Sequence, residues 1–305
     1  MALFNTGSAP KALLPGVNQW TGMAYDELGM EFKDIFRSVE ASDRNFEEDV
    51  SFYGMGLAVV KPEAENIAYD SMGQGFIKRY RHITYALGFM ISREAVEDNQ
   101  YVELAQKRSQ ALGFSMRQTK ENVAANVLNR AFNSSFVGAD GLELCSTAHL
   151  LAKGGTFQNE LSTAADLSEA ALEQMAIDIM DFRDDAGLRI AVMPRKLVVP
   201  RSLVFEAERI LNSALRSGSS ENDLNALKKK GVLPEGYCVN HYLSDQDAYF
   251  VLTNAQDGLK HFQRRGLEVK DDTPDFSSEV MKFKASERYA FGWTDPRGIF
   301  GSPGA

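Results

Sequence analysis

The sequence is poor in the residues that disulfide-bonded and membrane-spanning proteins need. Its 305 residues include two cysteines, Cys145 and Cys238, which are too few for a disulfide framework, so we interpret both as reduced thiols. No run of about 18 apolar residues occurs, which excludes a membrane-spanning helix. Positive charge is also scarce. Because the formal net charge is −9, binding to a nucleic-acid backbone is not expected as the main task.

The usual motifs of catalysis and nucleotide binding are absent as well. The sequence contains no G-x-S-x-G, G-x-G-x-x-G or Walker pattern. The most metal-like fragment holds Cys145 and His149, but zinc needs three or four ligands, and Cys238 and His241 could join only by tertiary coincidence. The same pair is unlike a hydrolase dyad, whose partners meet through the fold. We therefore expect no enzyme activity, no cofactor and no metal.

What the sequence does contain is an extended segment at residues 46–91. Alternating apolar residues predict an outgoing strand at 53–59, which Lys61 and Pro62 end, and a return strand at 76–91. The tip between them is rich in small and polar residues. A hairpin of this length has too little local core to stand alone. We therefore expect a neighbouring copy of the chain to cover it.

The residues before this segment are expected to form an arm. Pro10, Pro15 and Gly16 are predicted to break any early element, and a short helix is predicted at 21–36. An acidic cluster at 40–49 follows, which we interpret mainly as a solvated face.

A long helix is predicted after the return strand. Ser92 is its expected N-cap, and an apolar stripe at helical spacing continues over 99–132. Gly113 lies within this stripe and costs about 1 kcal/mol relative to alanine. We expect the helix to bend or break there. The alternative is that this glycine admits a close neighbour.

The second half of the sequence alternates helices and strands, which is typical of a compact α/β module. A helix is predicted from Ser168, its N-cap, to about residue 184. A buried strand, a helix at 200–212 and strands at 237–242 and 248–252 follow.

The strongest strand pattern lies near the end of the chain. One face of this strand consists of apolar residues: Met281, Phe283, Ala285, Tyr289, Phe291 and Trp293. Glu287 interrupts that face, so it needs a partner, a bulge or an exposed edge. Two pairs of adjacent carboxylates are interpreted as solvated, namely Asp184 with Asp185 and Asp271 with Asp272.

Several of these segments together resemble a known family. The segment ITYALGFMISREAVEDNQY, residues 83–101, resembles the junction of strand and spine helix in tailed-phage major capsid proteins of the Hong Kong 97 type. The matching residues of the junction are Ser92, Glu94, Glu97 and Asp98. The end of the chain is similar to the closing strand of that family at Glu287, Arg288, Phe291, Pro296 and Phe300. A middle segment is similar to the Mu-type head-protein branch at Asp140, Gly141, His149, Gly154, Gly155 and Asn159.

The resemblance implies an α+β fold of the Hong Kong 97 type in five segments. These are an N-terminal arm (1–45), an extended β-hairpin loop (46–91), a peripheral domain with the spine helix (92–164), an axial domain (165–255) and return strands of the peripheral domain (256–305). Gly113 would be a hinge of the spine helix.

The function implied is that of the major capsid (head) protein of a tailed double-stranded DNA bacteriophage, which self-assembles into hexamers and pentamers of an icosahedral shell. Expected partners are a separate scaffolding protein or maturation protease and a portal, with decoration proteins left open. The enclosed DNA would not be bound sequence-specifically, and no membrane is involved. The protein would be found in the virion after assembly in the host cytoplasm. Two alternatives stay open: an encapsulin-like compartment of the same fold, and a cytosolic α/β hydrolase that uses Cys145.

Charged residues are the candidate assembly contacts. Cations of the return strand are expected to meet acidic residues of adjacent subunits, and exposed pairs of this kind set register more than affinity. The full set of expected contacts is Lys61, Lys78, Arg79, Arg81, Glu47, Glu48, Asp49, Asp271, Asp272, Glu287 and Arg288. Lys61 and Lys78 flank the hairpin tip, but no acceptor asparagine or catalytic glutamate aligns with them. We therefore expect no covalent crosslink.

Overall fold

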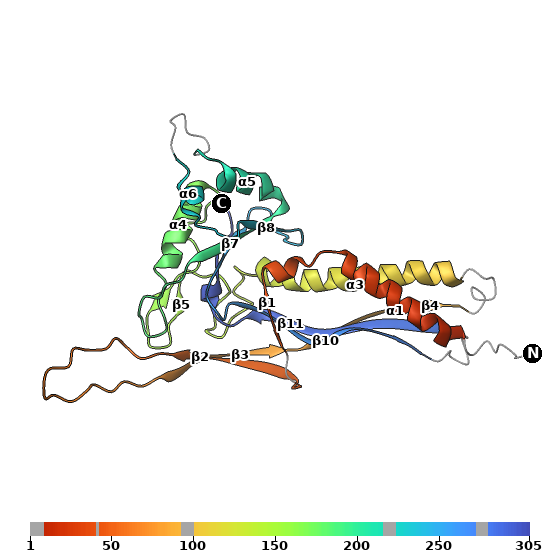
Figure 1. The fold of residues 1–305 in the computed structure, drawn as a ribbon, viewed down its shortest axis with the longest axis horizontal. Coiled ribbons are helices and arrows are strands. Elements are labelled where there is room, and N and C mark those ends of the chain that lie inside the picture. Colours follow the sequence, from red (N-terminus) through yellow and green to blue (C-terminus); the bar gives the residue numbers. More distant parts are fainter. Residues whose placement is uncertain (1–8, 41–42, 93–100, 216–223, 273–279) are drawn as a thin grey trace, which may run out of the picture.

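The chain is divided into an elongated body, a second body beside it, and a thin hairpin that projects away from both (Figure 1). The computed structural model describes residues 9–40, 43–92, 101–215, 224–272 and 280–305. Three residues of the predicted junction, Glu94, Glu97 and Asp98, lie outside this described part of the chain.

The elongated body is built on a four-stranded sheet in the order β1-β10-β11-β4. Its strands are β1 (Arg37–Glu40), β10 (Leu259–Asp271), β11 (Met281–Trp293) and β4 (Ile83–Ile91). β11 runs antiparallel to both β10 and β4, while β1 lies parallel to β10. Alternate residues of β11, including Met281, Phe283 and Ala285, are buried on one face. This confirms the apolar face that the sequence predicts.

Two helices, α1 (Ala9–Glu27) and α3 (Tyr101–Asn129), pack against this sheet (Figure 1). The long helix predicted at 99–132 is confirmed with shorter bounds. The prediction for the N-terminus is wrong, because α1 continues through Pro15 and only a 3-10 turn, η2 (Glu31–Asp34), follows it. Val17 of α1 is fully buried against Ala105 of α3. Such packing outweighs the hydrogen bond that a proline removes.

Gly113 does not break α3, which is one continuous helix from Tyr101 to Asn129. A Cβ atom at this position would lie 2.3 Å from the carbonyl oxygen of Thr21 and 3.2 Å from the Cβ of Ala24, both in α1. The predicted break is therefore wrong. The alternative interpretation, a glycine that admits a close neighbour, agrees with the contact between the two helices.

The second body surrounds a four-stranded sheet in the order β12-β9-β7-β8. Its strands are β7 (Pro194–Pro200), β8 (Tyr237–Asn240), β9 (Tyr249–Thr253) and β12 (Ile299–Ser302). The helices beside it are α4 (Glu169–Met180), η3 (Arg201–Leu203), α5 (Val204–Asn212) and α6 (Ala226–Lys230). Smaller elements of the chain are β5 (His149–Leu150), β6 (Thr156–Phe157) and η4 (Pro296–Gly298).

Most sequence predictions for this body are confirmed. Ser168 caps α4, because its hydroxyl oxygen accepts a hydrogen bond from the Ala171 amide at 3.2 Å. The helix ends at Met180, earlier than predicted. β12, from the segment predicted to be return strands, joins this sheet beside β9. The predicted domain boundaries as such stay a prediction.

The hairpin consists of β2 (Phe46–Tyr53) and β3 (Gly73–Arg81). The outgoing strand predicted at 53–59 is therefore wrong, because residues 54–72 contain no strand. The predicted return strand is two strands: β3 pairs with β2, and β4 pairs with β11 of the sheet. Apolar alternation at 53–59 has no opposite strand to pair with, and pairing defines a strand.

Candidate assembly surface

The two legs of the hairpin are held together partly by an ion pair. Arg79 donates to Oε1 of Glu48 through Nε at 2.8 Å and Nη2 at 2.6 Å, and its guanidinium lies 4.4 Å from the ring centroid of Phe46. Both charged side chains are exposed, so the pair contributes little free energy. These two residues therefore pair within one hairpin, and their expected contact with adjacent subunits stays a prediction.

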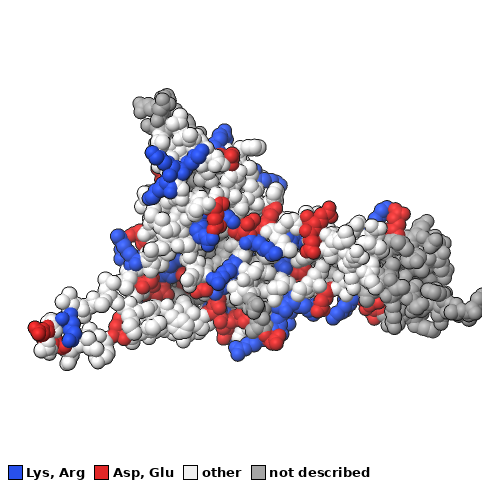
Figure 2. Space-filling view, in the orientation of Figure 1, with Lys and Arg blue, Asp and Glu red and all other residues white. Residues whose placement is uncertain are grey.

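The tip of the hairpin, residues 54–72, exposes a set of large apolar side chains. More than half of the surface of each is open to solvent: Met55, Leu57, Val59, Val60, Ile67, Tyr69 and Met72. Figure 2 shows this part of the molecule as mostly uncharged surface. So many large apolar side chains exposed in one segment mark an interaction site.

The tip nevertheless has a defined local structure. The Asp70 carboxylate accepts hydrogen bonds from the Gly56 amide at 2.7 Å and the Ser71 amide at 2.8 Å. These backbone donors lower the pKa of Asp70, because they stabilise its charged form. At the far end, Ala64 adopts a positive φ of 65°, in a turn that follows Pro62. The apolar side chains are thus presented on a closed loop.

A partly buried group of polar side chains anchors the base of the hairpin to the body. Nζ of Lys260 lies 2.6 Å from Oδ2 of Asp49 and 2.8 Å from Oδ1 of Asp257. The Thr294 hydroxyl donates to the same Asp49 oxygen at 2.7 Å, and its oxygen lies 2.5 Å from the Tyr80 hydroxyl. Asp49 and Tyr80 belong to the hairpin, whereas Lys260 and Thr294 belong to the sheet region. The hairpin direction is therefore set by contacts inside one chain.

Lys78 adds a second anchor at the same place. Its Nζ lies 4.6 Å from the ring centroid of Trp293 and donates to the Val137 carbonyl oxygen at 3.0 Å. Burial lowers the pKa of Lys78. A cation over an aromatic face is stabilised by the ring quadrupole. Lys78 thus contacts its own chain in this structure.

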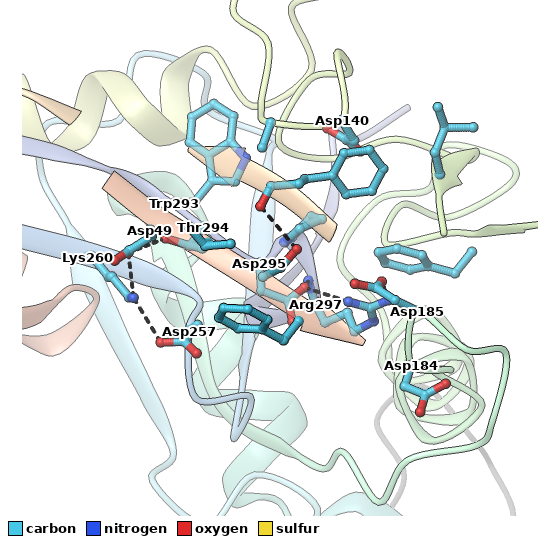
Figure 3. Close-up of a pocket in the computed structure, with 18 of the residues that line it drawn as sticks. Asp49, Asp140, Asp184, Asp185, Asp257, Lys260, Trp293, Thr294, Asp295 and Arg297 are labelled. Carbon is cyan, nitrogen blue, oxygen red and sulfur yellow. Dashed lines mark hydrogen bonds and ion pairs between the residues drawn. The ribbon is translucent and has the colours of Figure 1, made fainter. Parts of the chain in front are cut away.

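A cleft of about 400 Å³ lies beside these anchors, between the hairpin base and the body (Figure 3). Six aspartates and two cations line it: Asp49, Asp140, Asp184, Asp185, Asp257 and Asp295, with Lys260 and Arg297. Aromatic and aliphatic side chains form the rest of the wall, among them Phe52, Phe157 and Trp293. The cleft is thus both acidic and partly apolar.

Arg297 holds the inner wall of the cleft. Its Nη2 donates to Asp185 at 2.7 Å, its Nη1 donates to Asp295 at 3.1 Å, and its guanidinium lies 4.5 Å from the ring centroid of Phe157. Burial raises the pKa of Asp295. Asp185 is buried by this contact, which corrects its interpretation as a solvated carboxylate.

The remaining predicted contacts lie in different places. Lys61 is exposed at the tip, and Arg81 is exposed on β3. The side chain of Arg288 donates to the Asn45 side-chain oxygen at 2.7 Å, within the same chain. Asp271 and Asp272 lie at the far end of β10. These residues form no single surface, although Lys61 and Arg81 both belong to the hairpin.

Glu287 is not on the surface at all. It is fully buried, with Oε2 at 3.3 Å from Nζ of Lys120 in α3. Nζ of Lys120 also donates to the Gln263 side-chain oxygen at 2.5 Å. The prediction that an inward-facing Glu287 needs a partner is confirmed. Its assignment as an assembly contact is wrong, because its own chain encloses it.

The geometry of Cys145 argues against the hydrolase alternative. Cys145 is fully buried, and burial raises the pKa of its thiol well above the usual range, so a nucleophilic thiolate is disfavoured. Nδ1 of His149 lies 2.5 Å from Oδ2 of Asp140. Within the described ranges, no group of three or more His, Cys, Asp or Glu residues could hold a metal ion. None of the helices described there combines the length and apolarity needed to cross a bilayer.

Sequence reasoning missed the two ion clusters at the hairpin base. Lys260 and Arg297 belong to no motif, and their partners come from positions far away in the sequence. The signal that identified Glu287 was a charge that interrupts an alternating apolar face. This signal is weak at Lys260, because the residues two positions away are Gly258 and Phe262.

The sequence matches a family over most of its length. Residues 77–301 match the family described as phage capsid protein. The chain therefore belongs to the phage capsid protein family. This membership and the fold confirm the resemblance to tailed-phage major capsid proteins that the motifs suggested. The Mu-type branch stays a prediction.

Solved structures show where this fold occurs. A virus-like particle from Pyrococcus furiosus has a TM-score of 0.54 at 12% identity, covering 94% of this chain and 98% of that chain. Mycobacterium phage Adephagia has a TM-score of 0.54 at 11% identity, covering 90% of each chain. Mycobacterium phage Patience has a TM-score of 0.54 at 10% identity, covering 98% of this chain and 88% of that chain. No curated protein matched. At these identities the likeness establishes the fold alone, which is the predicted Hong Kong 97-type α+β fold.

Proposed function

We propose that this chain is the shell-forming subunit of a tailed double-stranded DNA phage, assembling into hexamers and pentamers in which each projecting hairpin is covered by a neighbouring copy. The observation that carries this proposal is the apolar hairpin tip, which its own chain leaves exposed. Repeated weak contacts of this kind become strong when they close on one another. The family membership supports a shell, and the net charge of −9 suits a container that does not grip its DNA.

The finer parts of the proposal concern partners and location. A scaffolding protein or maturation protease and a portal would act during assembly in the host cytoplasm, and the product would be the virion. The family membership favours a phage shell over an encapsulin-like compartment of the same fold. A hydrolase is disfavoured by the burial of Cys145.

Expression of the chain alone tests the proposal. We expect closed particles in negative-stain microscopy and a fast-sedimenting fraction in a sucrose gradient. A variant in which residues 55–71 are replaced by a short Gly-Ser turn is expected to keep the circular dichroism of the folded chain and to sediment as small species. The packed apolar clusters of the described residues include no residue of 55–71, so the deletion leaves them intact. A wild-type chain that stays monomeric, even with its scaffolding partner, would contradict the proposal.

A further inference from the structure

A second cleft, of about 450 Å³, lies where the two bodies meet, and we call it the junction cleft. Lys33 and Arg37 line it from η2 and β1, on the side of the elongated body. Arg195 and Lys196 line it from β7 of the second body. Four cations therefore share one recess, although the chain as a whole has a net charge of −9.

Two of these cations are balanced by the two carboxylates of the junction cleft. Nζ of Lys196 lies 3.5 Å from Oδ1 of Asp34 and 3.5 Å from Oε2 of Glu235. Arg195 also forms an ion pair with Glu235. These contacts connect η2 to β7 across the junction, and their charges cancel.

The other two cations, Lys33 and Arg37, have no such partner. Among the residues that the structure describes, neither forms an ion pair with a carboxylate. Nη1 of Arg37 donates to the Gln256 carbonyl oxygen at 3.3 Å, and this acceptor is neutral. Both side chains are exposed to solvent. With four cations against two carboxylates, the junction cleft keeps an excess of positive charge.

The rest of the lining is compact and includes a further hydrogen-bond donor. A Cβ atom on Gly298 would lie 2.3 Å from the Cα of Gly258, so these two glycines bring their backbones into direct contact. Oδ1 of Asn254 accepts a hydrogen bond from the Met193 amide at 2.8 Å. The side-chain oxygen of Asn254 is thus occupied, and its NH₂ group remains as a donor in the lining.

We infer that the junction cleft binds a phosphate group, which Lys33, Arg37 and the side-chain amide of Asn254 hold. Arginine and lysine suit this ligand, because their N–H groups form charge-assisted hydrogen bonds with phosphate oxygens. A phosphate with up to two negative charges matches the two cations that lack a carboxylate, whereas the same excess repels a metal cation. The inference goes beyond the proposed shell function and does not depend on it.

The position of the junction cleft gives the ligand a structural consequence. Lys33 and Arg37 belong to the elongated body, while Asn254 follows β9 of the second body. A bound phosphate therefore contacts both bodies and strengthens the connection that Lys196 already makes. Free phosphate and the phosphodiester backbone of a nucleic acid are two sources of the same group, and the experiment has one arm for each.

Isothermal titration calorimetry of the full chain tests the inference, with inorganic phosphate in one arm and a short DNA duplex in the other, at constant ionic strength. The site variant carries Lys33→Gln with Arg37→Gln. The control carries Lys229→Gln with Lys230→Gln, which removes the same charge from the exposed end of α6. We expect the site variant to bind at least about tenfold more weakly than the wild type, and the control to bind like the wild type.

The two arms separate the sources of the phosphate group. Phosphate binding that is weakened in the site variant alone identifies a site for free phosphate. Duplex binding weakened in that variant alone, without binding of free phosphate, assigns the group to a nucleic acid. Both results support the inference. Equal affinities of the site variant and the control, or no binding of either ligand to the wild type, would overturn it. Circular dichroism checks that every variant folds, and particle formation is measured separately, so neither result decides the shell function.

Discussion

Four charged side chains are buried between α3 and the sheet. Arg117 and Glu121 form one pair, with Nη2 and Oε1 at 3.5 Å, while Lys120 and Glu287 form the other. Burial lowers the pKa of Lys120 and raises that of Glu121. The pairs hold the N-terminal segment in place, because Glu121 accepts a hydrogen bond from the Phe32 amide at 3.1 Å. Buried pairs of this kind cost much when one partner is removed.

Removing one partner of the second pair should therefore be severe. Lys120→Met is expected to lower the free energy of unfolding by about 3–5 kcal/mol, because Glu287 stays buried without its cation. The double variant Lys120→Met with Glu287→Leu is expected to recover most of that loss. Urea unfolding of the unassembled chain measures both. A double variant as unstable as the single one would show that packing, rather than the unpaired charge, sets the cost.

A second prediction concerns acid and His261. Burial, together with the nearby charge of Lys120, lowers the pKa of His261 from 6.5 to about 3. The unfolded chain therefore takes up this proton first as the pH falls. Stability linked to His261 should be complete above pH 6.5 and should be lost progressively toward pH 3, by up to about 4 kcal/mol.

The measurement compares urea unfolding of the wild type and of His261→Phe between pH 7 and pH 4. Phenylalanine keeps an aromatic ring against Phe291, whose centroid lies 4.5 Å from that of His261. The variant is expected to lose less stability on acidification than the wild type. Parallel curves would show that carboxylates elsewhere account for the whole acid dependence.

At the scale of elements, the contact between α1 and α3 depends on one missing side chain. Gly113→Ala would add a methyl group 2.3 Å from the Thr21 carbonyl oxygen. We expect a loss of about 1–3 kcal/mol from overpacking, which outweighs the gain of about 1 kcal/mol in helix propensity. Chemical denaturation of the unassembled chain measures the net effect. A more stable Gly113→Ala chain that forms abnormal shells would instead support the hinge role predicted from the sequence.

The hairpin base yields a prediction with its own control. Lys260→Met removes the cation between Asp49 and Asp257, so β2 should lose its anchor on the sheet. We expect cleavage within β2 and β3 by limited proteolysis to become roughly tenfold faster, since about 1.4 kcal/mol of local stability accounts for that factor. Glu48→Gln breaks an exposed pair in the same hairpin and should change the rate little. Equal rates for both variants would show that Lys260 and its two carboxylates do not anchor the hairpin.

At the scale of the whole molecule, one chain buries most of its apolar side chains but leaves those of the hairpin tip exposed. The two bodies bury apolar residues in packed clusters, one of which joins both sheets through residues such as Phe250 and Leu259. The hairpin does the opposite, because it is too thin to enclose its apolar tip (Figure 1). Its direction is set inside the chain by Asp49 and Tyr80, while the tip stays exposed in the single chain. The proposed function expects neighbouring copies to cover it.

Features that depend on neighbouring residues along the chain could be predicted before the fold was known. The alternation in β11, the Ser168 cap and the long helix after the return strand follow from periodicity and local hydrogen bonding. The same patterns showed that Glu287 faces inward and that the hairpin lacks a core of its own.

Which distant residues meet depends on how the elements pack in three dimensions. Packing divides the predicted return strand between the hairpin and the sheet, places α1 against Gly113, and joins Asp49 to Lys260 across 211 positions of sequence. The physical reason is that periodicity reports which face of an element is apolar, whereas the identity of a partner depends on how whole elements pack. The sequence also does not show whether a charged side chain is surrounded by water or lies beside an opposite charge.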